Sequence, residues 1–107
     1  MGTIVYSNLV ELLLEEGDKT EKEIINETIK RFEIPEEQII KIKLQLDISQ
    51  DYFQKQKNGK YHLLKRIEDG IFGRKVFLET LNKAPAEYLK ERPWIQKLKE
   101  ALEKKVL

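Results

Sequence analysis

Apolar residues recur every three or four positions near the start of the chain, the spacing of an amphipathic α-helix. They are Val5, Leu9, Leu12, Leu13 and Leu14. Glu11 and Glu15 are expected on the opposite, polar side of this helix. Gly17 can adopt the left-handed conformation that ends a helix at low steric cost. The pattern therefore predicts a helix over residues 4–16.

A second helix has a start signal in Thr20-Glu-Lys-Glu23. In such a capping box the threonine hydroxyl accepts a hydrogen bond from the backbone of the glutamate three residues on, and that glutamate accepts one from the threonine backbone. The apolar positions that follow form one stripe, made of Ile25, Ile29 and Phe32. This helix is predicted over residues 21–32.

The third segment is compatible with two structures. Pro35, Glu36 and Glu37 suit a first helical turn, where proline and acidic side chains are favoured. From Ile40 to Ile48, however, apolar and polar residues alternate with the period of a half-buried strand. We predict a helix over residues 35–47, and the strand stays open as the alternative for residues 39–48.

Asn58-Gly59 lies between two short runs that can pair as antiparallel strands, the strongest local signal for a β-hairpin. No acidic residue occurs from Tyr52 to Ile67. Five cations do occur there, and they are Lys55, Lys57, Lys60, Lys65 and Arg66. The sequence therefore predicts a basic hairpin after three helices.

A two-residue turn at Asn58-Gly59 would place Lys57 opposite Lys60 and Lys55 opposite His62. These four side chains would share one face, where an anionic partner would offset the repulsion between like charges. The other face would pack on the helices through Tyr52, Tyr61 and Leu63, with Gln54 and Gln56. A three-residue loop would mix the two faces, and the lysines could also serve only to keep an exposed edge from aggregating.

The last third of the chain is predicted to be helical. One helix is expected over residues 71–82, a short helical piece over residues 85–91, and a final helix from Pro93 onward. The final helix carries an apolar stripe of Trp94, Ile95, Leu98, Leu102 and Val106. This stripe either packs back on the first helix of its own chain or pairs with the same helix, or the 71–82 helix, of a second chain. We favour the dimer by analogy with DNA-binding regulators that place the dimer contact in added helices, and it would relate two hairpins by a two-fold axis.

Composition narrows the class of protein. The chain has 107 residues, of which 36% are charged and none is cysteine. This indicates a mainly α-helical protein with a small β-hairpin and charged surfaces, without disulfides or thiolate metal sites. No segment reaches the roughly 18 apolar residues of a membrane span, and we expect a cytoplasmic protein.

Charge is distributed unevenly along the chain. The net charge of +1 combines −4 over residues 1–34, +3 over residues 35–66 and +2 over residues 67–107. Phosphate binding is therefore expected only from the second segment onward. His62 is the single histidine, and no motif of an enzyme, a metal site or a cofactor site is present, so we expect neither catalysis nor a cofactor.

Residues 4–66 resemble a winged helix-turn-helix domain, and more narrowly the HARE-type module at the N-terminus of the RNA polymerase delta subunit. The segments that carry the resemblance are Leu9-Val-Glu-Leu-Leu-Leu-Glu-Glu-Gly17, Pro35-Glu-Glu, Leu44-Gln-Leu-Asp-Ile48, Tyr52-Phe53 and Asn58-Gly-Lys-Tyr-His-Leu63. The resemblance implies a winged helix over residues 1–66 and a connection to transcription. Residues 67–107 replace the family's acidic tail with a helical extension.

We expect a small winged-helix DNA-binding protein that regulates transcription. The third helix would present Gln38, Lys41 and Gln45 to the major groove with Lys43 at its edge, because glutamine can read adenine and lysine can contact guanine or phosphate. The hairpin would hold phosphate through the lysines at 55, 57 and 60, with His62, Lys65 and Arg66 nearby.

Two other functions compete with this one. The same fold could be a protein–protein docking module of a larger nucleic-acid or mobile-element machine, with no direct base readout, and the acidic first helices support that alternative. A structural role in a phage or mobile-element assembly is a third possibility.

Overall fold

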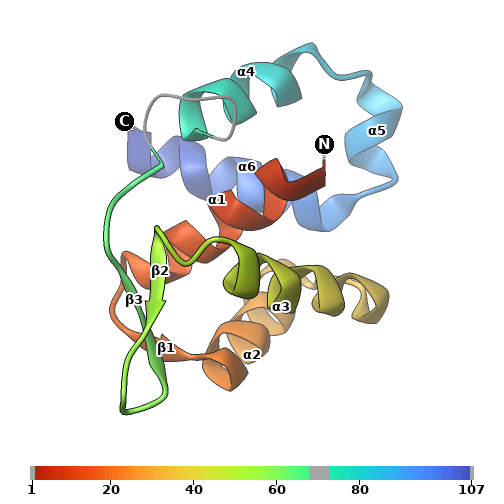
Figure 1. The fold of residues 1–107 in the computed structure, drawn as a ribbon. Helices are drawn as coiled ribbons and strands as arrows, with labels where there is room; N and C mark the ends of the chain where they lie inside the picture. Colours follow the sequence, from red (N-terminus) through yellow and green to blue (C-terminus); the bar gives the residue numbers. More distant parts are fainter. Residues whose placement is uncertain (1, 68–72, 107) are drawn as a thin grey trace.

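A computed structural model describes residues 2–67 and 73–106, with the side chains of residues 2, 3 and 106 left undescribed. Its elements are α1 (Gly2–Leu14), β1 (Lys19–Thr20), α2 (Glu21–Phe32), a 3-10 helix η1 (Glu36–Gln38), α3 (Ile39–Ile48), β2 (Phe53–Lys55), β3 (Lys60–Leu63), α4 (Arg74–Lys83), α5 (Ala86–Lys90) and α6 (Pro93–Val106). Three helices precede a small hairpin and three follow it (Figure 1). The predicted fold class, mainly helical with a small hairpin, is confirmed.

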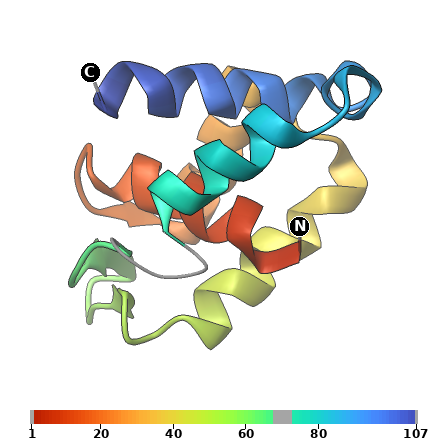
Figure 2. The ribbon, with the colours of Figure 1, turned by 90° about the horizontal axis from the view of Figure 1, so that it is seen from above.

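Helix α1 is surrounded by the rest of the chain. Every residue from Val5 to Leu14 is buried, and α1 contacts α2, α3, α4, α6 and β3. Figure 2 shows it between α6 on one side and α3 on the other. The prediction of an exposed polar side was wrong: Glu11 is only 2% exposed, because the C-terminal helices cover the side of α1 on which it lies.

Helix α2 begins and ends as its sequence predicts. The Thr20 hydroxyl accepts a hydrogen bond from the Glu23 amide at 3.1 Å, and the Glu23 carboxylate accepts one from the Thr20 amide at 2.9 Å. The buried stripe, however, is Ile24, Thr28 and Phe32, and Ile29 is exposed. Thr28 tolerates burial because its hydroxyl donates to the Ile24 carbonyl oxygen at 2.7 Å.

The alternating third segment is helical, not extended. Pro35 precedes η1 with an extended backbone, and α3 continues from η1 to Ile48. Ile42 and Leu46, one turn apart, lie in the core, and α3 contacts α1 and α2. The helix prediction is therefore confirmed, with a 3-10 turn at its start.

A strand that the sequence analysis did not predict completes the sheet. Residues Lys19–Thr20 form β1, which pairs antiparallel with β3, so that the strand order is β1-β3-β2. Lys19 lies opposite Tyr61, and Thr20 lies opposite Lys60. The residue that caps α2 therefore also ties the hairpin to the helices.

The C-terminal helices share one core with the rest of the chain. Phe77 and Leu81 of α4 are buried in the same cluster as the side chains of α1. A charged cluster at this junction holds α4 to α1: the Glu11 carboxylate accepts the Ile67 amide at 2.5 Å and the Arg74 guanidinium at 3.1 Å. Arg74 also pairs with Glu15.

The predicted dimer residues of the last helix lie inside the chain. Trp94, Ile95, Leu98 and Leu102 are at most 7% exposed, because α6 lays this stripe against α1, α2, α4 and α5. Their assignment to a dimer interface was wrong, and the alternative of packing within the chain is correct. The side chain of Val106 is not among those described.

The remaining helix boundaries differ from the predictions by a few residues. Helix α1 covers Gly2–Leu14 instead of residues 4–16, and α5 covers Ala86–Lys90 instead of residues 85–91. Helix α4 begins at Arg74, whereas residues 71 and 72 of the predicted helix lie outside the described part of the chain.

Burial of the α6 stripe gives a stability prediction. Leu98→Ala should lower the free energy of unfolding by about 2–5 kcal/mol, because it opens a cavity in the core. Leu44→Ala removes the same atoms from a side chain that is 54% exposed and should cost about 1 kcal/mol or less. Urea denaturation measures both. Equal losses would contradict the buried position of the stripe.

Glu11 gives a pH prediction. Burial raises the pKa of its carboxyl above the ordinary value of 4.5, against the opposing effects of the Ile67 amide and Arg74. The folded state then holds this proton more tightly than the unfolded state, so stability falls as pH rises from about 4.5 through the raised pKa. Glu11→Gln should remove that fall.

Urea denaturation of both proteins between about pH 4 and pH 7 measures this difference. Glu79→Gln serves as the control, because Glu79 is exposed on α4. A difference between wild type and Glu11→Gln that stays constant with pH, or that grows in favour of wild type as pH rises, would show that burial does not raise the pKa of Glu11.

Candidate nucleic-acid interface

The hairpin has a different register from the one predicted. Phe53 pairs with Leu63, Gln54 with His62 and Lys55 with Tyr61. The loop therefore has three residues, Lys57 to Gly59, closed by a hydrogen bond from the Gln56 amide to the Lys60 carbonyl oxygen at 2.9 Å. The prediction of a two-residue turn was wrong.

The backbone of the loop explains this outcome. Gly59 has a φ of +83°, whereas among the described non-glycine residues only Glu33 has a positive φ. A two-residue type I′ turn needs positive φ at both central positions. Asn58 instead keeps a negative φ and accepts the Lys60 amide with its side-chain oxygen at 2.9 Å, so only the glycine takes the left-handed position.

The new register redistributes the hairpin side chains. Phe53 and Tyr61 are buried and face the helices, and Lys55 shares their face. Lys60 and His62 lie on the other face, across from glutamines. The predicted face of four basic side chains therefore does not form, and Lys57 lies at the tip of the loop.

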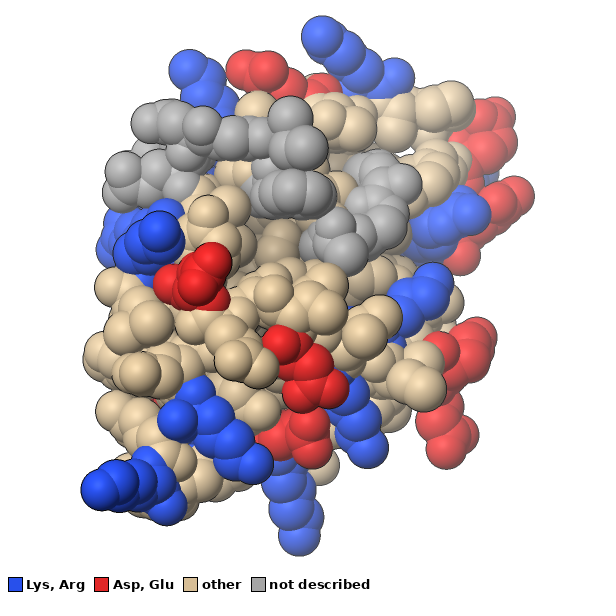
Figure 3. All heavy atoms as spheres, in the orientation of Figure 1, with Lys and Arg blue, Asp and Glu red and all other residues tan. Residues whose placement is uncertain are grey.

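Three hairpin lysines remain available to an anion. Lys55, Lys57 and Lys60 are exposed, and none of them belongs to an ion pair of the described residues. Figure 3 shows blue lysine and arginine side chains at the hairpin end of the molecule, with red carboxylates among them higher up. The three unpaired lysines therefore lie at the loop of the hairpin and at the strand ends beside it.

The other three predicted cationic positions have partners. His62 lies 2.7 Å from an oxygen of Asp18. Arg66 lies 3.9 Å from Glu15. The Lys65 ammonium lies 5.0 Å from the centre of the Tyr52 ring. All three are exposed, but they are less free to bind phosphate than the lysines at the tip.

Both predicted glutamines of the third segment form hydrogen bonds within the chain. Gln45 is 4% exposed and donates a hydrogen bond to the Ser49 hydroxyl. Gln38 is partly buried, and its side-chain oxygen accepts a hydrogen bond from the Tyr6 hydroxyl. The burial of Gln45 contradicts its assignment as a groove-facing residue. Gln38 remains partly exposed, so its assignment stays a prediction.

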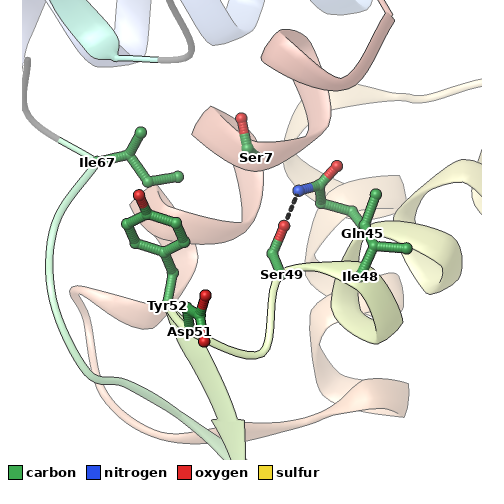
Figure 4. A pocket seen from close by; sticks show the side chains of 7 residues that line it. All are labelled: Ser7, Gln45, Ile48, Ser49, Asp51, Tyr52 and Ile67. Atoms are coloured by element: carbon green, nitrogen blue, oxygen red, sulfur yellow. Dashed lines mark hydrogen bonds between the residues drawn. The ribbon is translucent and has the colours of Figure 1, made fainter. Parts of the chain in front are cut away.

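A close view of Gln45 shows where it points. It lies beside a pocket of about 260 Å³ between α1 and the end of α3 (Figure 4). The other residues that line this pocket are Ser7, Ile48, Ser49, Asp51, Tyr52 and Ile67. A duplex lying on the outer surface of α3 would not reach this side chain.

The outer surface of α3 carries a feature that the sequence analysis missed. Ile40 is 70% exposed, Leu44 54% and Ile48 58%. They lie four residues apart and form one apolar stripe, which the alternating pattern concealed. Lys41 and Lys43 are exposed beside it, and the Lys41 ammonium lies 5.8 Å from the centre of the Tyr6 ring.

Two further kinds of feature are absent from the described part of the chain. Residues 2–67 and 73–106 hold no group of three or more His, Asp or Glu side chains suited to a metal ion, and none of their helices is long and apolar enough to cross a membrane. A comparison with protein-family models finds no match, and neither curated proteins nor solved structures yield one.

The three-residue loop can be tested by two substitutions. Gly59→Ala should lower the free energy of unfolding by about 1–2 kcal/mol, because alanine is strained at a positive φ. Asn58→Ala should cost less, about 0.5–1 kcal/mol, because it loses only the hydrogen bond to Lys60. Thermal or urea denaturation measures both. Equal costs would point to a two-residue turn.

Proposed function

We propose that this chain is a small winged-helix protein that binds the phosphate backbone of duplex DNA through its hairpin. The observation that carries the proposal is the set of three exposed lysines, Lys55, Lys57 and Lys60, none of which is paired with a carboxylate among the described residues. Such side chains gain most from an anionic partner, because phosphate contacts release condensed counterions from the duplex.

The sheet supports this role by fixing the position of the hairpin. Strand β3 is paired on both sides, with β1 and with β2, and Phe53 and Tyr61 anchor it in the core. Lys55 and Lys60 therefore project from paired strands, and Lys57 from the short loop that joins them. A supported hairpin loses less conformational freedom on binding, which favours the complex.

Binding of this kind depends little on base sequence. Gln38 and Gln45 are held by Tyr6 and Ser49, and the exposed centre of α3 is apolar. Lys41 and Lys43 are the members of the predicted α3 set that remain exposed, and they lie beside the apolar stripe. We assign the phosphate contacts to the hairpin lysines, and such contacts position a protein without reading bases. A regulatory role in transcription rests on the winged-helix resemblance.

The test is DNA affinity across a range of salt concentrations. Replacing Lys55, Lys57 and Lys60 together with Gln should make the slope of log affinity against log salt less steep by roughly 2.7, at about 0.9 for each phosphate that a lysine neutralises. Affinity should fall for every duplex sequence alike. Fluorescence anisotropy with random-sequence duplexes measures both quantities.

A matched control removes the same charge elsewhere. Lys83, Lys90 and Lys105 are exposed on α4, α5 and α6, and their joint replacement with Gln should change the slope by less than the value for a single phosphate, about 0.9. If the two triple variants behave alike, the hairpin is not the phosphate clamp. The protein–protein docking module then becomes the better description.

A further inference from the structure

The apolar stripe of α3, formed by Ile40, Leu44 and Ile48, is a surface feature that the proposed DNA binding does not use. Ile40, Leu44 and Ile48 are each more than half exposed, whereas monomeric proteins tend to keep aligned aliphatic side chains covered. In Figure 2, α3 lies along the outer edge of the molecule on the side away from α6. No described element packs over this edge, so a second molecule can reach it.

The two flanks of the stripe differ in charge. Successive residues of an α-helix turn by about 100°, which places Lys43 and Asp47 on one flank and Lys41 on the other. Asp47 lines a pocket together with Lys55 and Tyr61, so its flank faces the hairpin. Neither Lys43 nor Asp47 belongs to an ion pair of the described residues.

We propose that α3 pairs with α3 of a second copy of this chain, antiparallel across a two-fold axis at Leu44. The stripe is symmetric about Leu44, so the axis brings Ile40 opposite Ile48 of the second copy and Leu44 opposite Leu44. The flank that carries Lys43 and Asp47 then lies on the same side of the pair in both copies. Lys43 of one copy reaches Asp47 of the other, and this contact occurs twice.

The charges select this arrangement over a parallel one. In a parallel pair, the Lys43 flank of one helix would face the Lys41 flank of the other, so that Lys43 and Lys41 would repel each other. The antiparallel pair instead brings each Lys43 near Asp47 of the second copy, and these two contacts are attractive. It also puts both hairpins on one face of the dimer, because each hairpin lies beside the Asp47 flank of its own α3.

The pairing is expected to be weak. It involves one helix and three aliphatic side chains from each copy, well below the roughly 800 Å² per partner of a standard interface. Association should therefore appear between about 10 µM and 1 mM, where partner concentration offsets the entropy lost on binding. This inference does not depend on DNA binding, and it assigns the dimer to α3 instead of α6.

Sedimentation equilibrium of the full chain from about 20 µM to about 1 mM tests the proposal. The weight-average mass should rise from monomer toward dimer. Leu44→Glu, which alters an exposed position, should keep the fold by circular dichroism and remain a monomer throughout. A wild-type chain that stays monomeric at about 1 mM would overturn the proposal, and the stripe would then belong to a different partner.

Charge reversal tests the antiparallel register. Asp47→Lys and Lys43→Asp should each weaken self-association by roughly tenfold, since each creates two repulsive contacts. An equal mixture of the two variants should associate more tightly than either alone, because both contacts are then attractive. Lys41→Asp is the matched control and should leave association unchanged. A mixture no tighter than the single variants would refute this register.

Discussion

The burial of α1 from Val5 to Leu14 is the constraint on which the rest of the structure depends. A helix buried on all sides must be covered by several elements at once, and here α2, α3 and β3 contact α1 together with α4 and α6 from the C-terminal part. The burial of α1 includes Glu11, and a carboxylate in the core requires hydrogen-bond donors. The Ile67 amide and Arg74 supply them, and so link α1 to the segment after the hairpin and to α4.

The packing around α1 also decides which surfaces are left for binding. Gln38 accepts a hydrogen bond from the Tyr6 hydroxyl, and Gln45 donates one to Ser49 beside the pocket between α1 and α3. The outward side of α3 then carries the apolar stripe of Ile40, Leu44 and Ile48. The hairpin, in contrast, buries one aromatic side chain in each of its two strands, Phe53 and Tyr61, and leaves its lysines in solvent. The two surfaces therefore suit different partners.

Signals within a few residues predicted the secondary structure well. The features that depend on long-range packing, such as which side chains are buried, were predicted less well. Thr20 and Glu23 gave the start of α2 because a capping box is complete within four residues. The alternation from Ile40 to Ile48 suggested a strand, but Ile42 and Leu46 alone reach the core and the intervening aliphatic side chains lie outside. The α6 stripe was identified correctly as a pattern, yet no single sequence could show that α1 and α4 of the same chain cover it. The hairpin register depended on the sign of φ at Asn58. Asparagine can adopt either sign, so the residue type alone does not determine the register.

The central claim is that DNA meets the hairpin and not the outer face of α3. The most direct measurement is a titration of the ¹⁵N-labelled chain with a random-sequence duplex at low salt, followed by the backbone amide signals in NMR spectra. We predict that the largest chemical-shift changes fall within residues 54–66 and that the signals of residues 39–48 change little. Largest shifts within α3, or no shifts in the hairpin while the duplex is bound, would contradict it.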